Sequence, residues 1–119
     1  MSVRPPPFTM LADPALHDRL VRFVTQVNQA IRTVPFYAIN GGEFTSWYRT
    51  VRQNRDAKGE PESQHLLGLG ADVVVPDFQE FSRHLRRQGL VALVFEEHVH
   101  IQSVPKGTLP FERFRRLVV

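Results

Sequence analysis

Apolar residues repeat at helical spacing through residues 13–32, DPALHDRLVRFVTQVNQAIR. Asp13 is a residue type that caps helix N-termini, and Pro14 suits the first helical position. The segment therefore predicts a long amphipathic helix with one buried face. The positions expected on that face are Leu16, Leu20, Phe23, Val24, Val27 and Ile31.

A second helical pattern covers residues 76–89, PDFQEFSRHLRRQG. Asp77 is the expected N-cap, Glu80 lies at the position of a capping box, and Gly89 ends the helix. The apolar side chains of Phe78, Phe81 and Leu85 are spaced to share one face. This segment is expected to pack on the same core as the first helix.

The other patterned segments predict strands and the loops between them. These segments are a turn at 40–42, a short strand within 43–50, a surface loop or short helix plus loop at 52–62, a buried strand at 70–75, and one long or two consecutive strands at 90–104. The order predicts an α+β fold in which helices pack on a small, largely antiparallel sheet. Residues 1–12, with RPPP at 4–7, are expected to form an extended lead-in to a single domain at 13–119.

Length and composition fit that picture of one domain. The chain has 119 residues, 42% of them hydrophobic, and a net charge of +3. The weak positive charge favours anionic partners without choosing among them. No cysteine is present, so any transition metal must be held by histidine and carboxylate. No apolar run approaches the length of a membrane span or resembles a signal peptide, so synthesis in the cytoplasm without a signal peptide is expected.

Histidines concentrate in the segments that should form the sheet. His17 and His84 lie on the helices beside charged residues and are expected to be solvated. His65, His98 and His100 lie in or beside strands, as does Asp72. Three such ligands with one open position for water, and a carboxylate near that water, are what a hydrolytic zinc site needs.

The stretch EEHVH at 96–100 allows two geometries. In a regular strand His98 and His100 point the same way, together with Glu96, and Glu97 points to the other face. If a turn or bulge interrupts the strand near residue 98, Glu97 and His100 can converge on one metal, and His98 becomes a neighbour. Strand geometry alone leaves both arrangements open.

Two stretches, SWYRTVRQNRDAKGEPESQHLLGLGADVVV and EEHVHIQ, together resemble the zinc D-alanyl-D-alanine carboxypeptidase family of cell-wall peptidases. That family includes phage L-alanyl-D-glutamate endolysins and is related to the vancomycin-resistance dipeptidases. The resemblance spans roughly residues 44–102. The matching positions are Tyr48, Arg49, Asn54, Arg55, Gly59, Ser63, His65, Gly68, Gly70, Asp72, Glu97 and His100.

The resemblance implies a hedgehog/D-Ala-D-Ala peptidase-like fold and assigns roles to these residues. Zinc would be held by His65, Asp72 and His100. Glu97 would be the general base that activates water, and Arg49 would stabilise the oxyanion of the tetrahedral intermediate. This assignment requires the interrupted geometry of EEHVH.

Three further residues are expected beside the site in contact with substrate. His98 would flank the metal, and Tyr48 would form part of the core or of the cleft wall. Ser63 has two readings, as a hydroxyl that hydrogen-bonds a ligand or substrate, or as one that caps the loop.

Two positions depart from the usual pattern of the family. Gly70 stands where alanine is usual, which is a small change. Gln102 stands where carboxypeptidase relatives often have aspartate and endolysin-like relatives often have glutamine. The second departure favours an endopeptidase.

The sequence therefore predicts a monomeric zinc peptidase that acts on the stem peptides of bacterial peptidoglycan, and it is compatible with a phage origin. An inactive metal-binding recognition module of the same fold is the alternative, against which the presence of Glu97 argues. A nucleic-acid binder is favoured only by the basic balance, and no aromatic and basic recognition motif supports it. Neither nucleic acid nor membrane is expected as a partner.

Overall fold

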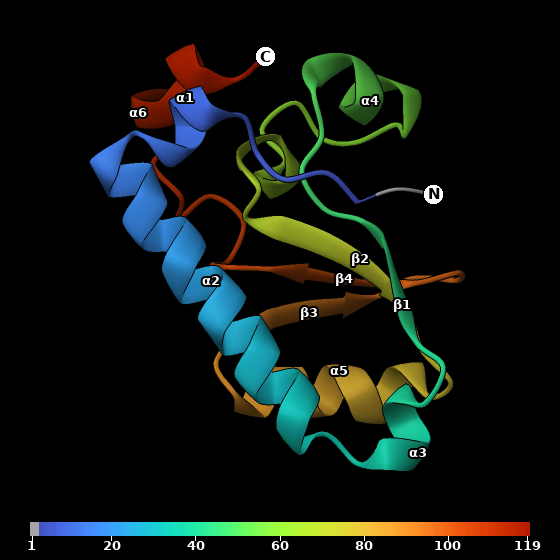
Figure 1. The fold of residues 1–119 in the computed structure, drawn as a ribbon. Coiled ribbons are helices and arrows are strands. Elements are labelled where there is room, and N and C mark those ends of the chain that lie inside the picture. Colours follow the sequence, from blue (N-terminus) through green and yellow to red (C-terminus); the bar gives the residue numbers. More distant parts are fainter. Residues whose placement is uncertain (1–2) are drawn as a thin grey trace.

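The structure is a computed structural model, and it describes residues 3–119. Its helices and strands follow one another as an α+β arrangement around one sheet (Figure 1). The elements are α1 (Phe8–Leu11), α2 (Pro14–Thr33), α3 (Phe36–Ile39), β1 (Glu43–Ser46), α4 (Val51–Asp56), the 3₁₀ helix η1 (Gln64–Leu67), β2 (Gly70–Val74), α5 (Phe78–Arg87), β3 (Val91–Val94), β4 (Val99–Gln102), α6 (Phe111–Phe114) and the 3₁₀ helix η2 (Arg115–Leu117). The predicted fold class is confirmed.

The sheet has four strands in the order β1-β2-β4-β3, and every neighbouring pair is antiparallel. In its central pair, Asp72 of β2 lies opposite His100 of β4, and Leu93 of β3 lies opposite His100 on the other side. Because side chains alternate along a strand, these residues share one face of the sheet. Val73, Val99 and other buried apolar residues occupy the opposite face, which belongs to the core.

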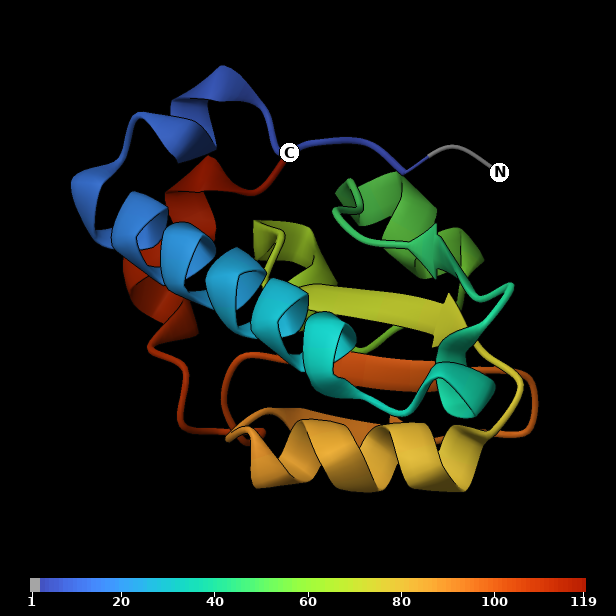
Figure 2. The ribbon, with the colours of Figure 1, turned by 60° about the horizontal axis from the view of Figure 1, so that its bottom comes forward.

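Helix α2 crosses the core face of the sheet, and α5 packs beside β3 (Figures 1 and 2). The Asp13 carboxylate accepts a hydrogen bond from the Leu16 amide at 3.0 Å, so the predicted N-cap is confirmed. Val24 is an exception to the predicted buried face, because its side chain is 40% exposed. The buried stripe instead continues through Ala30, which lies three residues after Val27 and seven after Phe23.

Helix α5 begins and ends where the sequence predicts. The Asp77 carboxylate accepts from the Glu80 amide at 3.0 Å, which caps the first turn. Phe81 and Leu85 are fully buried, and Gly89 follows the helix with φ of +88°, a conformation that glycine adopts without strain.

The structure corrects the expectation for the N-terminal segment and decides between the two arrangements left open for residues 90–104. Residues 1–2 of the extended lead-in expected over 1–12 lie outside the described residues. The expectation is wrong from residue 8, because Phe8–Leu11 forms α1 and buries Met10 in the core. A helix of four residues is too short to show a hydrophobic period in the sequence. The segment 90–104 forms two consecutive strands, β3 and β4, which is the second of the two predicted arrangements. No helix within residues 3–119 is long and apolar enough to cross a membrane.

Candidate metal centre

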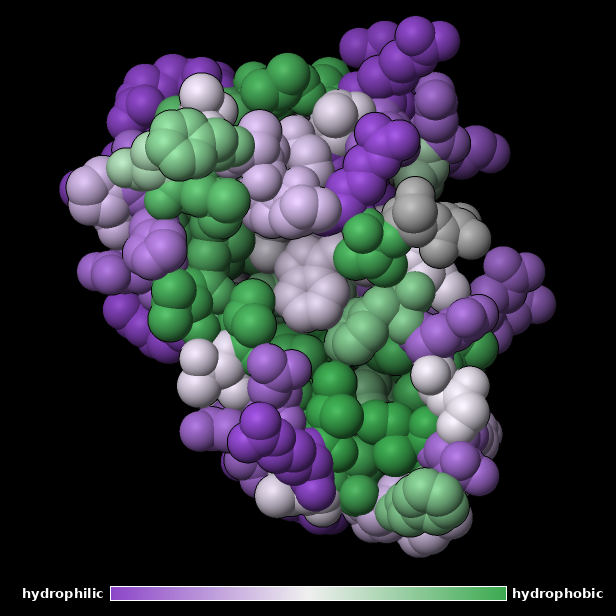
Figure 3. Space-filling model, viewed as in Figure 1, coloured by the Kyte–Doolittle hydropathy of each residue, from purple (hydrophilic) through white to green (hydrophobic). Residues whose placement is uncertain are grey.

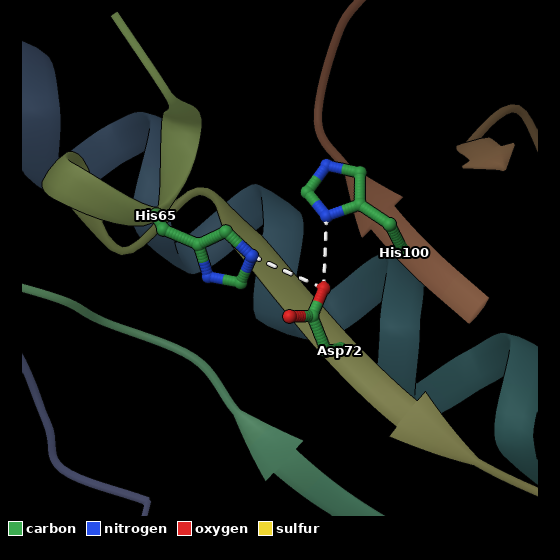
Figure 4. Close-up of side chains that lie close together, drawn as sticks. All are labelled: His65, Asp72 and His100. Atoms are coloured by element: carbon green, nitrogen blue, oxygen red, sulfur yellow. Dashed lines mark hydrogen bonds and ion pairs between the residues drawn. The ribbon is translucent and has the colours of Figure 1, made fainter. Parts of the chain in front are cut away.

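Three potential metal ligands converge on the sheet face opposite α2. His65 comes from η1, Asp72 from β2 and His100 from β4, and one ligand atom of each lies within 4.8 Å of the others (Figure 4). Asp72 Oδ1 is 3.1 Å from His65 Nε2 and 3.0 Å from His100 Nδ1. The structure thus brings together all three residues that the sequence analysis assigns to the metal.

The turn between η1 and β2 brings His65 back to Asp72. Ser63 begins η1 by accepting a hydrogen bond from the His65 amide at 3.2 Å. Gly68 ends η1 with φ of +72°, which allows the chain to reverse tightly. A Cβ atom at Gly70 would lie 3.0 Å from the backbone nitrogen of His65, so the glycine lets the start of β2 approach η1 closely. These small residues make the ligand spacing of seven positions geometrically possible.

The ring nitrogen of His65 that faces away from the cluster has a hydrogen-bond acceptor. His65 Nδ1 lies 2.5 Å from the carbonyl oxygen of Trp47. A carbonyl oxygen can only accept, so Nδ1 carries a proton, and Nε2 is the nitrogen that faces Asp72 and is available to a metal when the ring is neutral. Such a hydrogen bond on the far nitrogen fixes the orientation of metal-binding histidines.

His100 has the same arrangement with its two nitrogens exchanged. Its Nε2 lies 2.8 Å from the side-chain oxygen of Gln102, and its Nδ1 faces Asp72. With both outer nitrogens donating, each ring turns its other nitrogen toward one carboxylate oxygen, to which that nitrogen donates when protonated and offers a lone pair when it is not. Three acceptors this close repel one another unless protons or a cation lie between them. Two nitrogens and one oxygen are ligands that zinc accepts, so the residues present fit a zinc ion.

Asp72 is buried at 6% exposure and held by charge on its second oxygen. Its Oδ2 accepts from Arg49 Nη2 at 2.7 Å, which leaves Oδ1 for the histidines. Burial by itself raises the pKa of Asp72, but the hydrogen bonds with His100 and His65 hold that pKa well below its usual range. The carboxylate is therefore ionised at neutral pH, as a metal ligand must be.

Arg49 contacts several parts of the site at once. Its Nε donates to the Ser46 hydroxyl at 2.9 Å, and its Nη1 lies 3.5 Å from the side-chain oxygen of Asn54. Its backbone amide donates to the His65 carbonyl at 2.9 Å. The structure places Arg49 against a ligand, where it orients Asp72. Its role toward an oxyanion stays a prediction.

The stretch EEHVH is interrupted as the family-like geometry requires. Strand β3 ends at Val94 and β4 begins at Val99, with the Phe95 amide donating to the His98 carbonyl at 2.9 Å across the turn. Glu97 lies in this turn with an exposed side chain. Its role as the base stays a prediction, because within residues 3–119 it makes no hydrogen bond or ion pair with the cluster.

His98 lies beside the three ligands but is not part of their group. Its Nε2 is 3.6 Å from Asp72 Oδ1, and its ring stacks on Phe95 with centroids 5.1 Å apart. Its side chain is 32% exposed. This position agrees with a neighbour of the metal that can also reach a bound molecule.

Ser63 and Tyr48, both expected to contact substrate, have structural contacts. The Ser63 hydroxyl caps η1, which is the second of its two sequence-based readings. Tyr48 is half-buried against the core, and burial raises the pKa of its hydroxyl. Whether either also contacts substrate stays a prediction.

Sequence reasoning did not identify the groups that hold the outer nitrogens of the histidines. The Trp47 acceptor is a backbone carbonyl, which no residue type signals. Gln102 was singled out only as a difference between relatives, although its position two residues from His100 on one strand places it on the same face.

Fold and site together define a small α+β protein with a His-Asp-His centre suited to a hydrolytic metal ion. The family model described as Peptidase M15 matches residues 22–102, and the chain belongs to this family. Peptidases of the family are zinc-dependent, and membership implies a peptide substrate from the cell wall. The comparisons with curated proteins and with solved structures give no match.

Proposed function

We propose that this protein is a zinc-dependent peptidase that hydrolyses peptide bonds in the stem peptides of bacterial peptidoglycan. The observation that carries the proposal is the convergence of His65 Nε2, Asp72 Oδ1 and His100 Nδ1, with both outer ring nitrogens already donating elsewhere. Membership in the Peptidase M15 family supports the same reading. Three protein ligands leave a coordination position open for water or substrate.

The bond that we propose is cleaved is the L-Ala-D-Glu bond of the stem peptide, as in an endopeptidase of the endolysin type. Gln102 favours this over D-Ala-D-Ala carboxypeptidase activity, because endolysin-like relatives often have glutamine at the matching position. A monomer that acts on the cell wall, encoded by a phage, is part of the same proposal.

His65, Asp72 and His100 would hold the zinc ion, which would supply a Lewis acid and lower the pKa of a water molecule toward 7. The chain's own groups have separate tasks. Arg49 orients Asp72 through its contact with Oδ2. Glu97, in the exposed turn next to His98, accepts a proton from water and returns it to the leaving amine.

The sheet face around the centre offers contacts for a peptide. Leu93 lies opposite His100 on β3, and its side chain is 46% exposed. Phe95, which is 50% exposed, stacks on His98 at the start of the turn. These apolar side chains form one flank of the centre, and we assign them to packing against the substrate side chains.

Digestion of purified peptidoglycan, with the released fragments identified by mass spectrometry, tests both the activity and the bond. The wild type should release fragments whose new termini identify the cleaved bond. An intact polymer, with the zinc-loaded protein still bound to it, would favour the recognition-module alternative.

The adjacent glutamates provide a matched pair of variants for the base. Glu97→Gln should retain zinc and the fold but reduce hydrolysis by about two to four orders of magnitude, the usual scale for a lost general base. Glu96→Gln removes the same charge one residue away and should leave hydrolysis within a few fold of wild type. The reverse pattern would show that the base has been assigned to the wrong glutamate.

A further inference from the structure

Two glutamine side chains meet at one backbone carbonyl behind the metal centre. The Val104 carbonyl oxygen accepts from Gln102 Nε2 at 2.8 Å and from Gln64 Nε2 at 2.7 Å. Because a carbonyl oxygen has no proton to give, each glutamine must turn its NH₂ group toward Val104. The orientation of both amides is therefore determined.

With its NH₂ group on Val104, Gln102 presents only its oxygen to His100. That oxygen lies 2.8 Å from His100 Nε2, and an amide oxygen can only accept. His100 must then carry a proton on Nε2, so that in the neutral ring Nδ1 has the lone pair. Nδ1 is the atom that lies 3.0 Å from Asp72 Oδ1.

The second glutamine ties this arrangement to the segment that bears the other histidine ligand. Gln64 is 5% exposed and directly precedes His65. Its oxygen accepts from both the amide and the hydroxyl of Ser103, at 3.1 and 2.6 Å. The start of η1 and the chain after β4 are thus joined through buried hydrogen bonds.

From these contacts we infer that Gln102 is a positioning residue, which sets the neutral tautomer of His100 so that Nδ1 is available to the metal. The inference rests on the metal centre of the proposed function. It assigns to Gln102 a physical role in metal binding, in addition to any role in distinguishing substrates. Gln64 supports the arrangement by sharing the Val104 carbonyl.

Zinc affinity, measured by competition with a chromogenic chelator, tests this role without any assay of hydrolysis. Gln102→Leu removes the acceptor and should weaken zinc binding about 10- to 100-fold, the usual effect of losing such a partner. Gln102→Glu keeps an acceptor for His100 but cannot donate to Val104, and it should bind zinc within about threefold of wild type. Gln79→Leu, at an exposed position on α5, is the matched control and should not change the affinity.

Two results of the affinity measurement would overturn the inference. Unchanged zinc affinity in Gln102→Leu would show that the acceptor is not needed. An equal loss in Gln102→Leu and Gln102→Glu would show that the tie to Val104 is what matters, which is a purely structural role.

A second measurement uses the unaltered sequence and remains informative if the leucine variant does not fold. In the metal-free wild type, nitrogen-15 NMR of the histidine rings should show His100 with a proton on Nε2, its signal assigned by its loss in His100→Asn. A ring with a proton on Nδ1 only would contradict the inference. Failure of the wild type to bind zinc would instead refute the proposed function, because the tautomer is measured without metal.

Discussion

His98 and His100 lie two positions apart, yet the structure gives them different relations to Asp72. Only His100 belongs to the group of converging ligand atoms, and His98 Nε2 stays 3.6 Å from the carboxylate. His98→Ala should therefore retain close to one equivalent of zinc, whereas His100→Ala should retain almost none. Metal analysis of the purified variants checks this, and loss of zinc from His98→Ala would make His98 a ligand.

Arg49 is predicted to act on the metal through Asp72. Arg49→Leu should weaken zinc binding about 10- to 100-fold, because the carboxylate loses the partner that orients it. Arg49→Lys should not restore the affinity, since a compact ammonium group lacks the planar fork whose Nε and Nη2 lie at fixed spacing against Ser46 and Asp72. Chelator competition measures the effect, with Arg52→Leu on the surface of α4 as control. An arginine that contacts only substrate would leave zinc affinity unchanged in these variants.

The sequence was sufficient to predict the residues of the metal cluster but not their supports. Four residues stand out because ionisable side chains in buried segments need a reason to be there, namely His65, Asp72, His98 and His100. The resemblance to the peptidase family was needed to select three of them and to set His98 aside. The Trp47 carbonyl and the second oxygen of Asp72 involve contacts between distant segments, which become visible only when the strands are in register. The roles of Glu97 and of the substrate-contacting residues stay predictions.

Among the elements, α4 and the loop after it depend on a close contact between Gly59 and Asn54. A Cβ atom built at Gly59 would lie 2.0 Å from the Asn54 side-chain oxygen, and Asn54 Nδ2 donates to the Glu60 carbonyl at 2.8 Å. Gly59→Ala should therefore displace Asn54 from Arg49 and lower the melting temperature. The same substitution in an Asn54→Ala background should cost much less, because the clashing atoms are gone.

Thermal unfolding of the two single variants and the double variant checks this coupling. Equal effects of Gly59→Ala in both backgrounds would mean that the glycine is needed for its backbone conformation and not because a side chain would collide with Asn54.

Elements with explicit end signals were the ones that the sequence predicted well. Asp13 and Asp77 cap α2 and α5 as expected, because an N-cap is a local contact within one turn. Helix α1 was missed, since it is held by the burial of Met10 in a core formed by distant segments. The division of 90–104 into two strands was one of two open readings, because turn residues such as glycine or proline are missing there.

At the scale of the whole molecule, the apolar core and the candidate metal ligands lie on opposite faces of the same sheet. Helix α2 and the apolar core cover one face, and the cluster lies on the other (Figures 1 and 4). Apolar side chains also reach the surface over the helical side, as the space-filling view shows (Figure 3). Asp72 and His100 thus project from paired strands, on the face of the sheet that the core does not cover.

Zinc should stabilise the whole fold measurably. At a free zinc concentration 100 times the Kd, binding contributes about 2.7 kcal/mol, or a rise of roughly 10 °C in Tm for a domain of this size. The His65→Ala variant should lose both the zinc and this rise. Calorimetry with and without zinc checks the prediction, and an equal rise in the variant would indicate that zinc stabilises the protein from another site.

The register of the two central strands has a consequence for how the protein exchanges its metal. Asp72 and His100 are held opposite each other by the backbone pairing of β2 with β4, which does not need an ion. In classical zinc fingers, by contrast, the ligands come together only when metal binds, and chelators unfold the domain. Here a chelator should act as a reversible inhibitor, leaving a folded, empty protein that recovers its activity when zinc is returned.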